Sequence, residues 1–226
     1  MDFETALGYL PVLLDGLIQT VWLTALTLVI GAAIALPVAW CRNADSTAAR
    51  AFAITFVFVF RGAPLLVLLF LIYYGAPDLP IIRQTVLWEA FREPVFCAIL
   101  ALSLNSAGYL SEVIAGAVRA VPRGEVEAAR VAGLSRFSVA RHVILPNAAR
   151  IGLRAYGNEV TFVIKGTSVA SLVTITDLMA SANRVYYSTF DPFTPLIGAG
   201  CLYFLFVLLL GRTINALERR LSVGNA

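Results

Sequence analysis

Five long apolar stretches decide what this 226-residue chain can fold into. A helix needs about 20 mostly apolar residues to cross the hydrocarbon core of a bilayer. Hydrophobic residues make up 59% of the chain and charged residues 14%, which is more apolar than an ordinary soluble domain. We therefore predict an all-α integral membrane protein with about five transmembrane helices in a single domain, residues 1–226. The expected spans are 17–39, 51–74, 95–118, 151–173 and 196–217, and a preceding segment, 3–15, is expected to lie along the outer interface.

One charged segment, residues 121–146, interrupts the apolar chain between the third and fourth expected spans. Each charge at the bilayer centre costs roughly 2.5–3.5 kcal/mol, so inserting this segment would cost more than about 10 kcal/mol. The segment must therefore lie in water. Its charged residues include Arg123, Glu125, Glu127, Arg130, Arg136 and Arg141.

The distribution of arginine predicts the orientation of the chain, because cytoplasmic loops of membrane proteins carry an excess of Lys and Arg. With the N-terminus outside, twelve arginines fall on inner segments and three, Arg83, Arg92 and Arg184, fall on outer segments. This bias places the charged segment in the cytoplasm, and an odd number of spans places the C-terminus there too. The inner arginines are Arg42, Arg50, Arg119, Arg123, Arg130, Arg136, Arg141, Arg150, Arg154, Arg212, Arg219 and Arg220.

Proline, glycine and serine predict two short helices within the charged segment. Pro122 can open the first helix, because a proline in the first turn lacks only an N–H that would be unpaired anyway. Gly133 suits a left-handed stop, and Ser135 can cap a second helix that runs toward Leu145 before Pro146. Such a hairpin can insert into a groove on a partner protein. The alternative is a solvated hairpin that only connects two spans.

Four ionisable residues lie in or near the expected spans: Arg61, Glu112, Glu159 and Lys165. Such groups usually face the interior of a helix bundle or an aqueous path. We expect Arg61 to play a structural part, donating hydrogen bonds to carbonyl groups that Pro64 leaves free. Glu112 can neutralise such a cation or take part in the path.

Glu159 is the most informative of these four residues. It lies early in the fourth span beside Asn158, and Phe162 and Gly166 follow at helical spacing on the same face. A carboxylate, an aromatic edge and a gap can together bind the ammonium or cationic side chain of an amino acid. The alternative is an ion pair between Glu159 and Lys165 or an arginine of another helix.

Two further features concern partners. In the third span, small residues recur every four positions and allow close helix packing in lipid, either against the chain's own helices or against a second subunit. This stripe consists of Ser103, Ala107, Ser111 and Ala115. The chain has no GxxxxGK[ST] phosphate loop, so ATP hydrolysis would need a partner protein. The net charge of +3 does not by itself indicate a nucleic-acid partner.

Several separated motifs resemble one family of membrane proteins. The charged segment resembles the EAA loop of ABC importer permeases, and we name residues 119–150 the coupling loop. The RGAPLL sequence from Arg61 and the YYG sequence from Tyr73 look like motifs of the polar amino-acid branch. The M-type subunits of systems for histidine, lysine, arginine, ornithine and opines are most similar. The resemblance also rests on Glu127, Ala128, Ala129, Gly133, Leu145 and Pro146 in the coupling loop, and on Gly157, Asn158, Glu159, Lys165, Thr167 and Ser168 in the fourth span.

The resemblance implies an ATP-driven importer of the bacterial inner membrane for polar, and in particular cationic, amino acids or opines. The coupling-loop residues named above would dock on a cytoplasmic ATPase dimer, which binds ATP and Mg²⁺. The chain itself is expected to hold no cofactor or metal and to catalyse no reaction. A second permease subunit and a periplasmic substrate-binding protein would complete the system. The implied substrate path contains Asn158, Glu159, Phe162, Gly166, Thr167 and Ser168, although Gly166 stands where many relatives have an acidic residue.

An ion-coupled secondary amino-acid carrier is the alternative function, with Glu112 and Glu159 binding protons or sodium. Such a carrier predicts inverted internal repeats, and the five expected spans show no matching halves. A membrane enzyme would need a catalytic group of side chains, and none is readable in the sequence.

Overall fold

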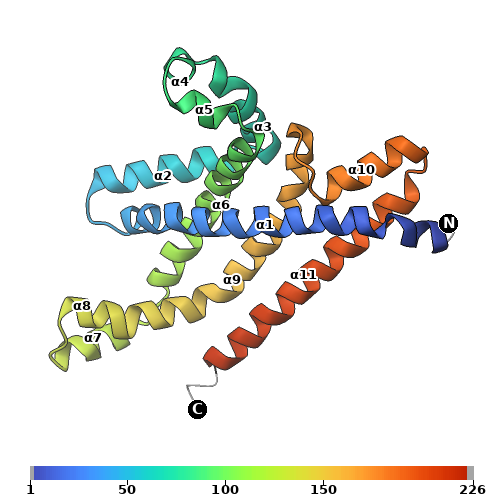
Figure 1. The fold of residues 1–226 in the computed structure, drawn as a ribbon. Coiled ribbons are helices and arrows are strands. Elements are labelled where there is room, and N and C mark those ends of the chain that lie inside the picture. Colours follow the sequence, from blue (N-terminus) through green and yellow to red (C-terminus); the bar gives the residue numbers. More distant parts are fainter. Residues whose placement is uncertain (1–2, 223–226) are drawn as a thin grey trace.

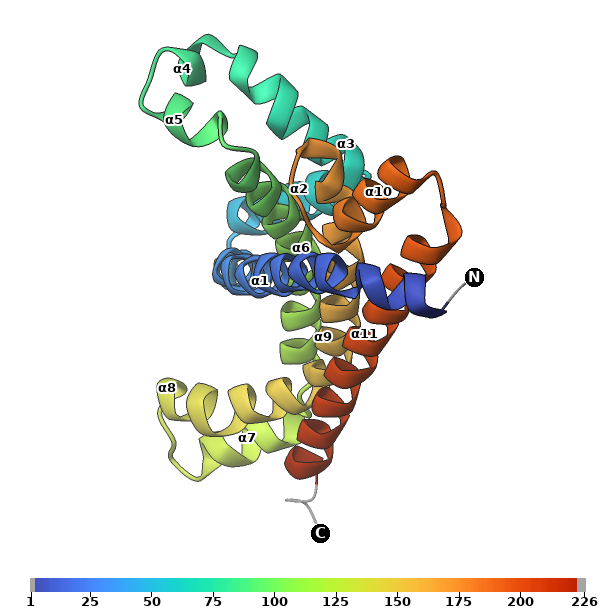
Figure 2. The same cartoon turned by 45° about the vertical axis from the view of Figure 1, so that its right-hand side comes forward.

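The computed structural model describes residues 3–222 and shows the expected all-helical fold (Figures 1 and 2). No β-strand occurs within these residues. The long helices are α1 (Phe3–Arg42), α2 (Thr47–Gly62), α6 (Pro94–Arg119), α9 (Leu145–Gly166), α10 (Leu178–Thr189) and α11 (Phe193–Ser222). The short elements are α3 (Leu65–Phe70), η1 (Leu71–Gly75), η2 (Ala76–Asp78), α4 (Pro80–Arg83), α5 (Leu87–Phe91), α7 (Arg123–Val131), α8 (Arg136–Val139), η3 (Ala140–Ile144) and η4 (Thr167–Val173).

Three helices, α1, α6 and α11, are long and apolar enough to cross a membrane without a break. Two bent pairs account for the other expected spans. In one pair α2 meets the helical segment that begins with α3 at 100°, and in the other the segment that ends with η4 meets α10 at 48°. The coupling loop, which contains α7 and α8, lies at the opposite end of the molecule from the α4–α5 hairpin (Figures 1 and 2).

The first helix is longer than the sequence predicted. α1 is one helix of 40 residues, although Pro11 and Pro37 lie within it. The segment 3–15 therefore forms the beginning of α1 and is not a separate interfacial element. α1 packs along α6 at short range, since a Cβ atom added to Gly31 would lie 3.3 Å from the Ser106 hydroxyl oxygen.

The stripe of small residues on α6 is used inside the chain. Ser103, Ala107, Ser111 and Ala115 are all buried in the single chain, and Ala107 packs in an apolar cluster with Ala35 of α1. Small side chains let two helices approach closely in lipid, where the hydrophobic effect does not drive association. Of the two uses predicted for this stripe, the structure shows packing against the chain's own helices.

The second expected span breaks at Ala63 and Pro64, where the backbone is extended between α2 and α3. Proline cannot donate to the preceding turn, so carbonyl groups at the end of α2 need another donor. The side-chain amide of Asn105 supplies one, donating to the Phe60 carbonyl at 2.8 Å. The sequence predicted this part for Arg61, but within residues 3–222 no hydrogen bond from the Arg61 side chain is found.

The prediction that a cytoplasmic helix ends before Pro146 is wrong. The backbone stays helical from α8 through η3 into α9, with Pro146 in the first turn of α9. The wider π turn of η3 precedes this proline. Single π turns of this kind occur inside α-helices, so the helix continues past the proline. The fourth expected span is thus the continuation of the coupling loop's second helix.

A buried polar cluster joins α10 to α1 and α11. Asp177 is fully buried; one of its carboxylate oxygens caps α10 by accepting from Ala180 N at 2.9 Å, and the other accepts from the Tyr203 hydroxyl at 3.1 Å. The Thr20 hydroxyl of α1 accepts from Leu178 N at 3.1 Å. These hydrogen bonds satisfy the start of a helix that the apolar pattern did not predict.

The turn between α10 and α11 carries a further cap. Asp191 accepts from the backbone N–H groups of Phe193 and Thr194 at the start of α11. A hydrogen bond from the Thr194 side chain, with those backbone bonds, holds the pKa of the Asp191 carboxyl below its usual range. An ionised carboxylate at a helix N-terminus is favoured by the helix dipole, so α11 begins here.

Candidate functional site

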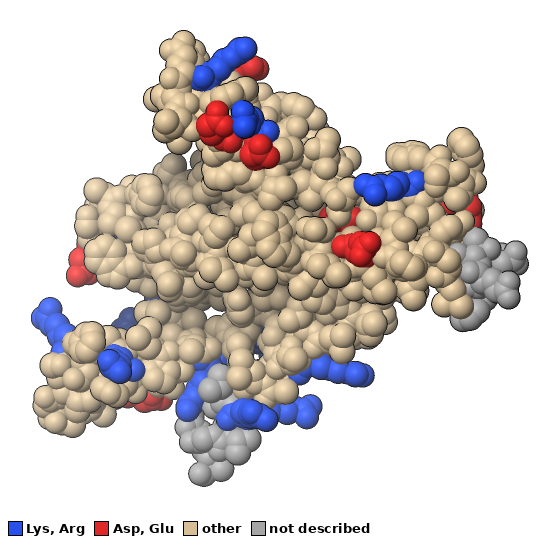
Figure 3. Space-filling view, viewed as in Figure 1, with Lys and Arg blue, Asp and Glu red and all other residues tan. Residues whose placement is uncertain are grey.

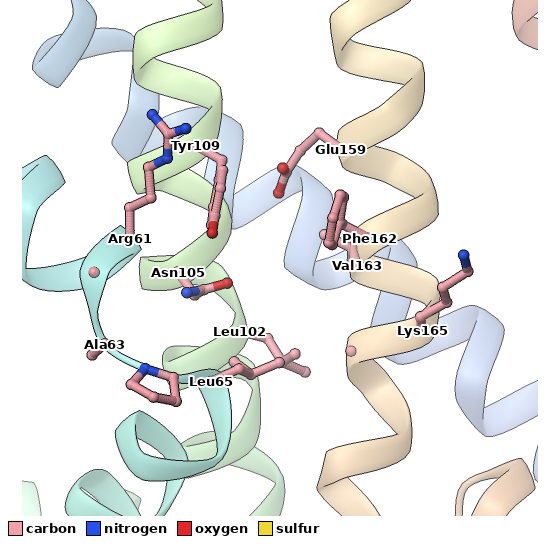
Figure 4. Close-up of a pocket in the computed structure, with 13 residues that line it drawn as sticks. Arg61, Ala63, Leu65, Leu102, Asn105, Tyr109, Glu159, Phe162, Val163 and Lys165 are labelled. Atoms are coloured by element: carbon pink, nitrogen blue, oxygen red, sulfur yellow. The ribbon is translucent and has the colours of Figure 1, made fainter.

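A cavity of about 450 Å³ lies between the α2–α3 break, α6 and α9 (Figure 4). Its walls combine the RGAPLL segment with residues of α6 and with the face of α9 that carries Glu159. The lining residues are Arg61, Gly62, Ala63, Pro64, Leu65, Leu102, Asn105, Tyr109, Glu159, Phe162, Val163, Lys165 and Gly166. The cavity therefore lies at the 100° bend between α2 and the segment that begins with α3.

Glu159 is the carboxylate of this cavity. It is only 5% exposed, and within residues 3–222 no ion pair with Glu159 occurs within 4.0 Å. Its side chain points toward the cavity, whereas the side chain of Lys165, six residues farther along α9, extends away from it (Figure 4). The expected alternative of a Glu159–Lys165 ion pair is therefore not formed in this structure.

Arg61 approaches the cavity from the opposite side through an aromatic contact. Its guanidinium carbon lies 4.9 Å from the centre of the Tyr109 ring, within the range of a cation–π interaction. Tyr109 in turn stacks on Phe162 of α9, with ring centres 6.3 Å apart and planes inclined by 11°. The cavity thus has a cation on one side, a carboxylate on the other and aromatic rings between them.

Glu112 does not reach this cavity. It forms an ion pair with Arg42 at the end of α1, with 2.6 Å between the Arg42 Nε and Glu112 Oε1 atoms. Both side chains are about one quarter exposed, at 29% and 24%. Of the two parts predicted for Glu112, the structure shows the neutralisation of a cation, and the cation is Arg42.

The other residues expected in the path are placed in different ways. Phe162 and Gly166 line the cavity, and a Cβ atom at Gly166 would lie 3.0 Å from Leu65 Cδ2. Thr167 is buried and donates its hydroxyl hydrogen to the Ile164 carbonyl at 2.7 Å. Asn158 and Ser168 do not line the cavity; the Ser168 hydroxyl donates to the Lys165 carbonyl at 2.7 Å.

Sequence reasoning missed two polar residues of the cavity, Asn105 and Tyr109, both on α6. They are four residues apart and so share a face of that helix. The available signal was an amide inside an otherwise apolar span, since a polar side chain in lipid usually contacts another helix or a path. The stripe of small residues marked a different face of the same helix.

The coupling loop contains the short helix α7, a turn at Gly133 and a second helix that begins with α8 and continues through η3 into α9. Gly133 has a φ of +82°, and Leu134 N donates to the Ala129 carbonyl at 3.1 Å, which closes the end of α7. Ser135 caps α8 by accepting from Ser138 N at 3.2 Å. The Asn147 side-chain amide donates to the Glu125 carboxylate, so α7 is attached to the start of α9.

The coupling-loop residues expected to meet an ATPase are accessible in the single chain. Glu127, Ala128, Gly133, Leu145 and Pro146 are exposed. Ala129 is half-buried. The loop also exposes large apolar side chains, among them Val131 at 89% and Phe137 at 72%. Exposed apolar groups on a helical hairpin are typical of a surface that binds another protein.

Comparison with known proteins identifies the family. Residues 27–223 match the family model described as "binding-protein-dependent transport system inner membrane component". The chain belongs to this family. It is a permease subunit of an ABC importer, an integral protein of the inner membrane.

Similar proteins include the nopaline transport system permease protein NocM of Agrobacterium fabrum, 39% identical over 96% of this chain and 91% of that protein. The histidine/lysine/arginine/ornithine transport system permease protein HisM of Salmonella typhimurium is 39% identical over 91% of this chain and 88% of its own length. A solved structure of an amino acid ABC transporter with histidines has a TM-score of 0.85 and 31% identity, covering 97% of this chain and 99% of that one. The methionine transporter MetNI shares the fold, with a TM-score of 0.78 and 20% identity.

Membership of the family decides several predictions. Permeases of this kind pair in the membrane and work with a separate ATPase and a binding protein, so this chain is not itself an enzyme. The alternative of an ion-coupled secondary carrier is wrong, because the family consists of ATP-driven importers. No group of three metal-ligating side chains occurs within residues 3–222.

Proposed function

We propose that the permease carries cationic polar amino acids or opines, and that the cavity around Glu159 is the place where it recognises them. The observation behind this proposal is the buried Glu159 carboxylate, which faces the cavity with no ion-pair partner. The similar permeases NocM and HisM are named for nopaline and for histidine, lysine, arginine and ornithine. Nearly all of these substrates carry a basic side chain.

The charges of the cavity suit an amino acid with a positive side chain. A carboxylate attracts a cation far more strongly in a low-dielectric environment than in water, and a buried carboxylate without a partner is costly. A bound cation would therefore stabilise Glu159. Arg61 on the opposite wall can attract the substrate's own carboxylate, while Tyr109 and Phe162 offer flat surfaces for its side chain.

We further propose that the whole chain, residues 1–226, acts as one permease domain, of which residues 1–2 and 223–226 lie outside the described part. The coupling loop docks on the ATPase dimer, which binds ATP and Mg²⁺, and residues Glu127, Ala128, Ala129, Gly133, Leu145 and Pro146 form the docking surface. Because η3 joins α8 to α9 in one helical run, motion of the docked loop reaches the Glu159 cavity through α9. Rigid helices of this kind transmit a two-state change.

The proposed orientation has the N-terminus in the periplasm and the C-terminus in the cytoplasm. In Figure 3 the Lys and Arg side chains gather along the lower edge, over the coupling loop and the end of α11. An excess of basic residues is typical of the cytoplasmic side. The α4–α5 hairpin would then face the periplasm and the binding protein.

The test is Glu159→Gln, which keeps size and hydrogen bonding but removes the charge. We expect uptake of arginine to fall by tenfold or more while uptake of a neutral polar amino acid falls much less, because only the cation loses its counter-charge. Uptake is measured in proteoliposomes at matched amounts of assembled complex. Glu112→Gln is the matched control, since this carboxylate pairs with Arg42 outside the cavity and should affect both substrates alike. An equal loss of both substrates in Glu159→Gln would contradict the proposal.

A further inference from the structure

Three buried hydroxyl groups have no hydrogen-bond partner among the residues that the structure describes. They are the Thr27 hydroxyl of α1 and the Ser103 and Ser106 hydroxyls of α6. Each of these residues is at most 2% exposed. Most buried polar groups in folded proteins are hydrogen-bonded, because an unpaired one costs free energy. A buried hydroxyl without a partner is thus a donor that is still available for a further contact.

The Ser106 hydroxyl lies where α1 and α6 approach each other closely. A Cβ atom added to Gly31 of α1 would be 3.3 Å from the Ser106 hydroxyl oxygen and 3.4 Å from the Ser103 carbonyl oxygen. Because glycine has no side chain, Gly31 offers no side-chain acceptor to Ser106. A side-chain acceptor for this hydroxyl must therefore come from another element.

The Glu159 carboxylate of α9 can be this acceptor. Glu159 is 5% exposed, and its side chain points from α9 toward α6 (Figure 4). Ser106 lies beside this carboxylate, between the cavity residues Asn105 and Tyr109 in the sequence of α6. No hydrogen bond joins the two groups in this structure. A hydroxyl hydrogen rotates to suit its acceptor and a glutamate side chain turns about its own bonds, so side-chain rotation can form the contact.

A carboxylate can accept from Ser106 and from a cation at the same time, because it has two oxygens and about four lone-pair positions. A hydrogen bond to an ionised acceptor is about twice as strong as one between neutral groups. Such a bond also fixes the direction in which the carboxylate points. Within residues 3–222 no ion pair holds Glu159, so no cation of the chain fixes this direction.

From this arrangement we propose that Ser106 is a positioning residue for Glu159. Its hydroxyl donates to one carboxylate oxygen and leaves the other oxygen to the cationic group of the substrate. The inference rests on the proposed function of the Glu159 cavity and names a further residue that sets its preference for a cation. Ser106 does not line the cavity, so it acts through Glu159 and not by touching the substrate.

The experiment compares arginine with citrulline, which has nearly the same shape but a neutral end group. Binding of each labelled amino acid is measured on the complete complex of this chain with its partner permease and ATPase, purified in detergent. Ser106→Ala should weaken arginine binding about tenfold, because one hydrogen bond to a charged group is lost, and should change citrulline binding by less than about twofold. The change removes only the hydroxyl group, and binding is compared at matched amounts of assembled complex.

The matched control is Ser103→Ala, which removes an equally unpaired and buried hydroxyl three residues earlier in α6. This variant should leave the ratio of arginine to citrulline affinity unchanged. In a Glu159→Gln background, Ser106→Ala should lower this ratio no further. The inference is overturned if Ser106→Ala weakens both ligands alike, lowers the ratio no more than Ser103→Ala does, or lowers it equally in both backgrounds.

The single variant Glu159→Gln separates this inference from the proposed function. If Glu159→Gln leaves the ratio of arginine to citrulline affinity unchanged, the cavity does not recognise the cation, and the proposed function is wrong together with the inference. If Glu159→Gln lowers the ratio and Ser106→Ala does not, the proposed function stands and Ser106 is not a positioning residue.

Discussion

Asp177 allows the sharpest test of what holds α10 against α1 and α11. Its two carboxylate oxygens make different contacts, one with Ala180 N at 2.9 Å and one with the Tyr203 hydroxyl at 3.1 Å. Asp177→Ala removes a helix cap, which costs about 1 kcal/mol, and leaves the Tyr203 hydroxyl without an acceptor, which costs about 1–3 kcal/mol. The expected total loss is about 2–4 kcal/mol.

This loss should be visible as a lower unfolding temperature of the purified complex in detergent. A change of 1 kcal/mol shifts the midpoint by about 2–4 °C for a chain of this size, so the expected decrease is about 4–16 °C. Asp177→Asn should lose much less, because the amide oxygen can still accept one of the two hydrogen bonds. Ser135→Ala is the control: it removes a cap of similar geometry at an exposed site and should cost only about 1 kcal/mol.

Two outcomes would refute this reasoning. If Asp177→Ala lowers the midpoint no more than Ser135→Ala does, burial and the Tyr203 contact contribute nothing. If Asp177→Asn is as damaging as Asp177→Ala, the negative charge matters and the hydrogen bonds do not.

Two further predictions concern the coupling loop and the topology. Gly133→Val should reduce the amount of ATPase that is recovered with the complex, because a β-branched residue adopts the φ of +82° at this position only at a cost. The control is Gly124→Val, at an open helical position without positive φ, which should leave the recovery unchanged. Equal recovery of ATPase with both variants would contradict the docking assignment. Single cysteines at Ser135 and Asp78, in a chain lacking Cys41, Cys97 and Cys201, should react with a membrane-impermeant reagent from opposite sides of the membrane, with Ser135→Cys reached only from the cytoplasm. Labelling of both from outside would show that the predicted orientation is wrong.

The sequence alone determined the features that depend on short stretches of chain. Five apolar stretches predicted an all-helical membrane protein, because a span needs only length and apolar composition. The positive φ of Gly133 and the cap at Ser135 were equally readable, since a turn and a helix start depend on a few consecutive residues. The motif order of the coupling loop also predicted the family that the comparison confirmed.

Sequence periodicity could not predict the bends. It marked residues 51–74 as a span but did not predict the 100° bend at Pro64. It also placed a helix end before Pro146, where the helix in fact continues from η3 into α9. A proline ends a helix in one context and is absorbed in another, depending on whether a neighbouring group or a wider turn satisfies the freed carbonyls. Asn105 supplies that group from α6, 45 residues along the chain from Phe60.

The tertiary structure alone decided which polar groups meet. Glu112 pairs with Arg42, 70 residues away, and Asp177 accepts from Tyr203 of a different helix. Arg61 lies against Tyr109, and Glu159 faces the cavity without Lys165. Helical spacing gives the face of one helix on which a side chain lies, but the rotation and crossing of two helices depend on the packing of all their small and large residues together. For that reason the sequence predicted which charged residues matter, and only the packed helices determined their partners.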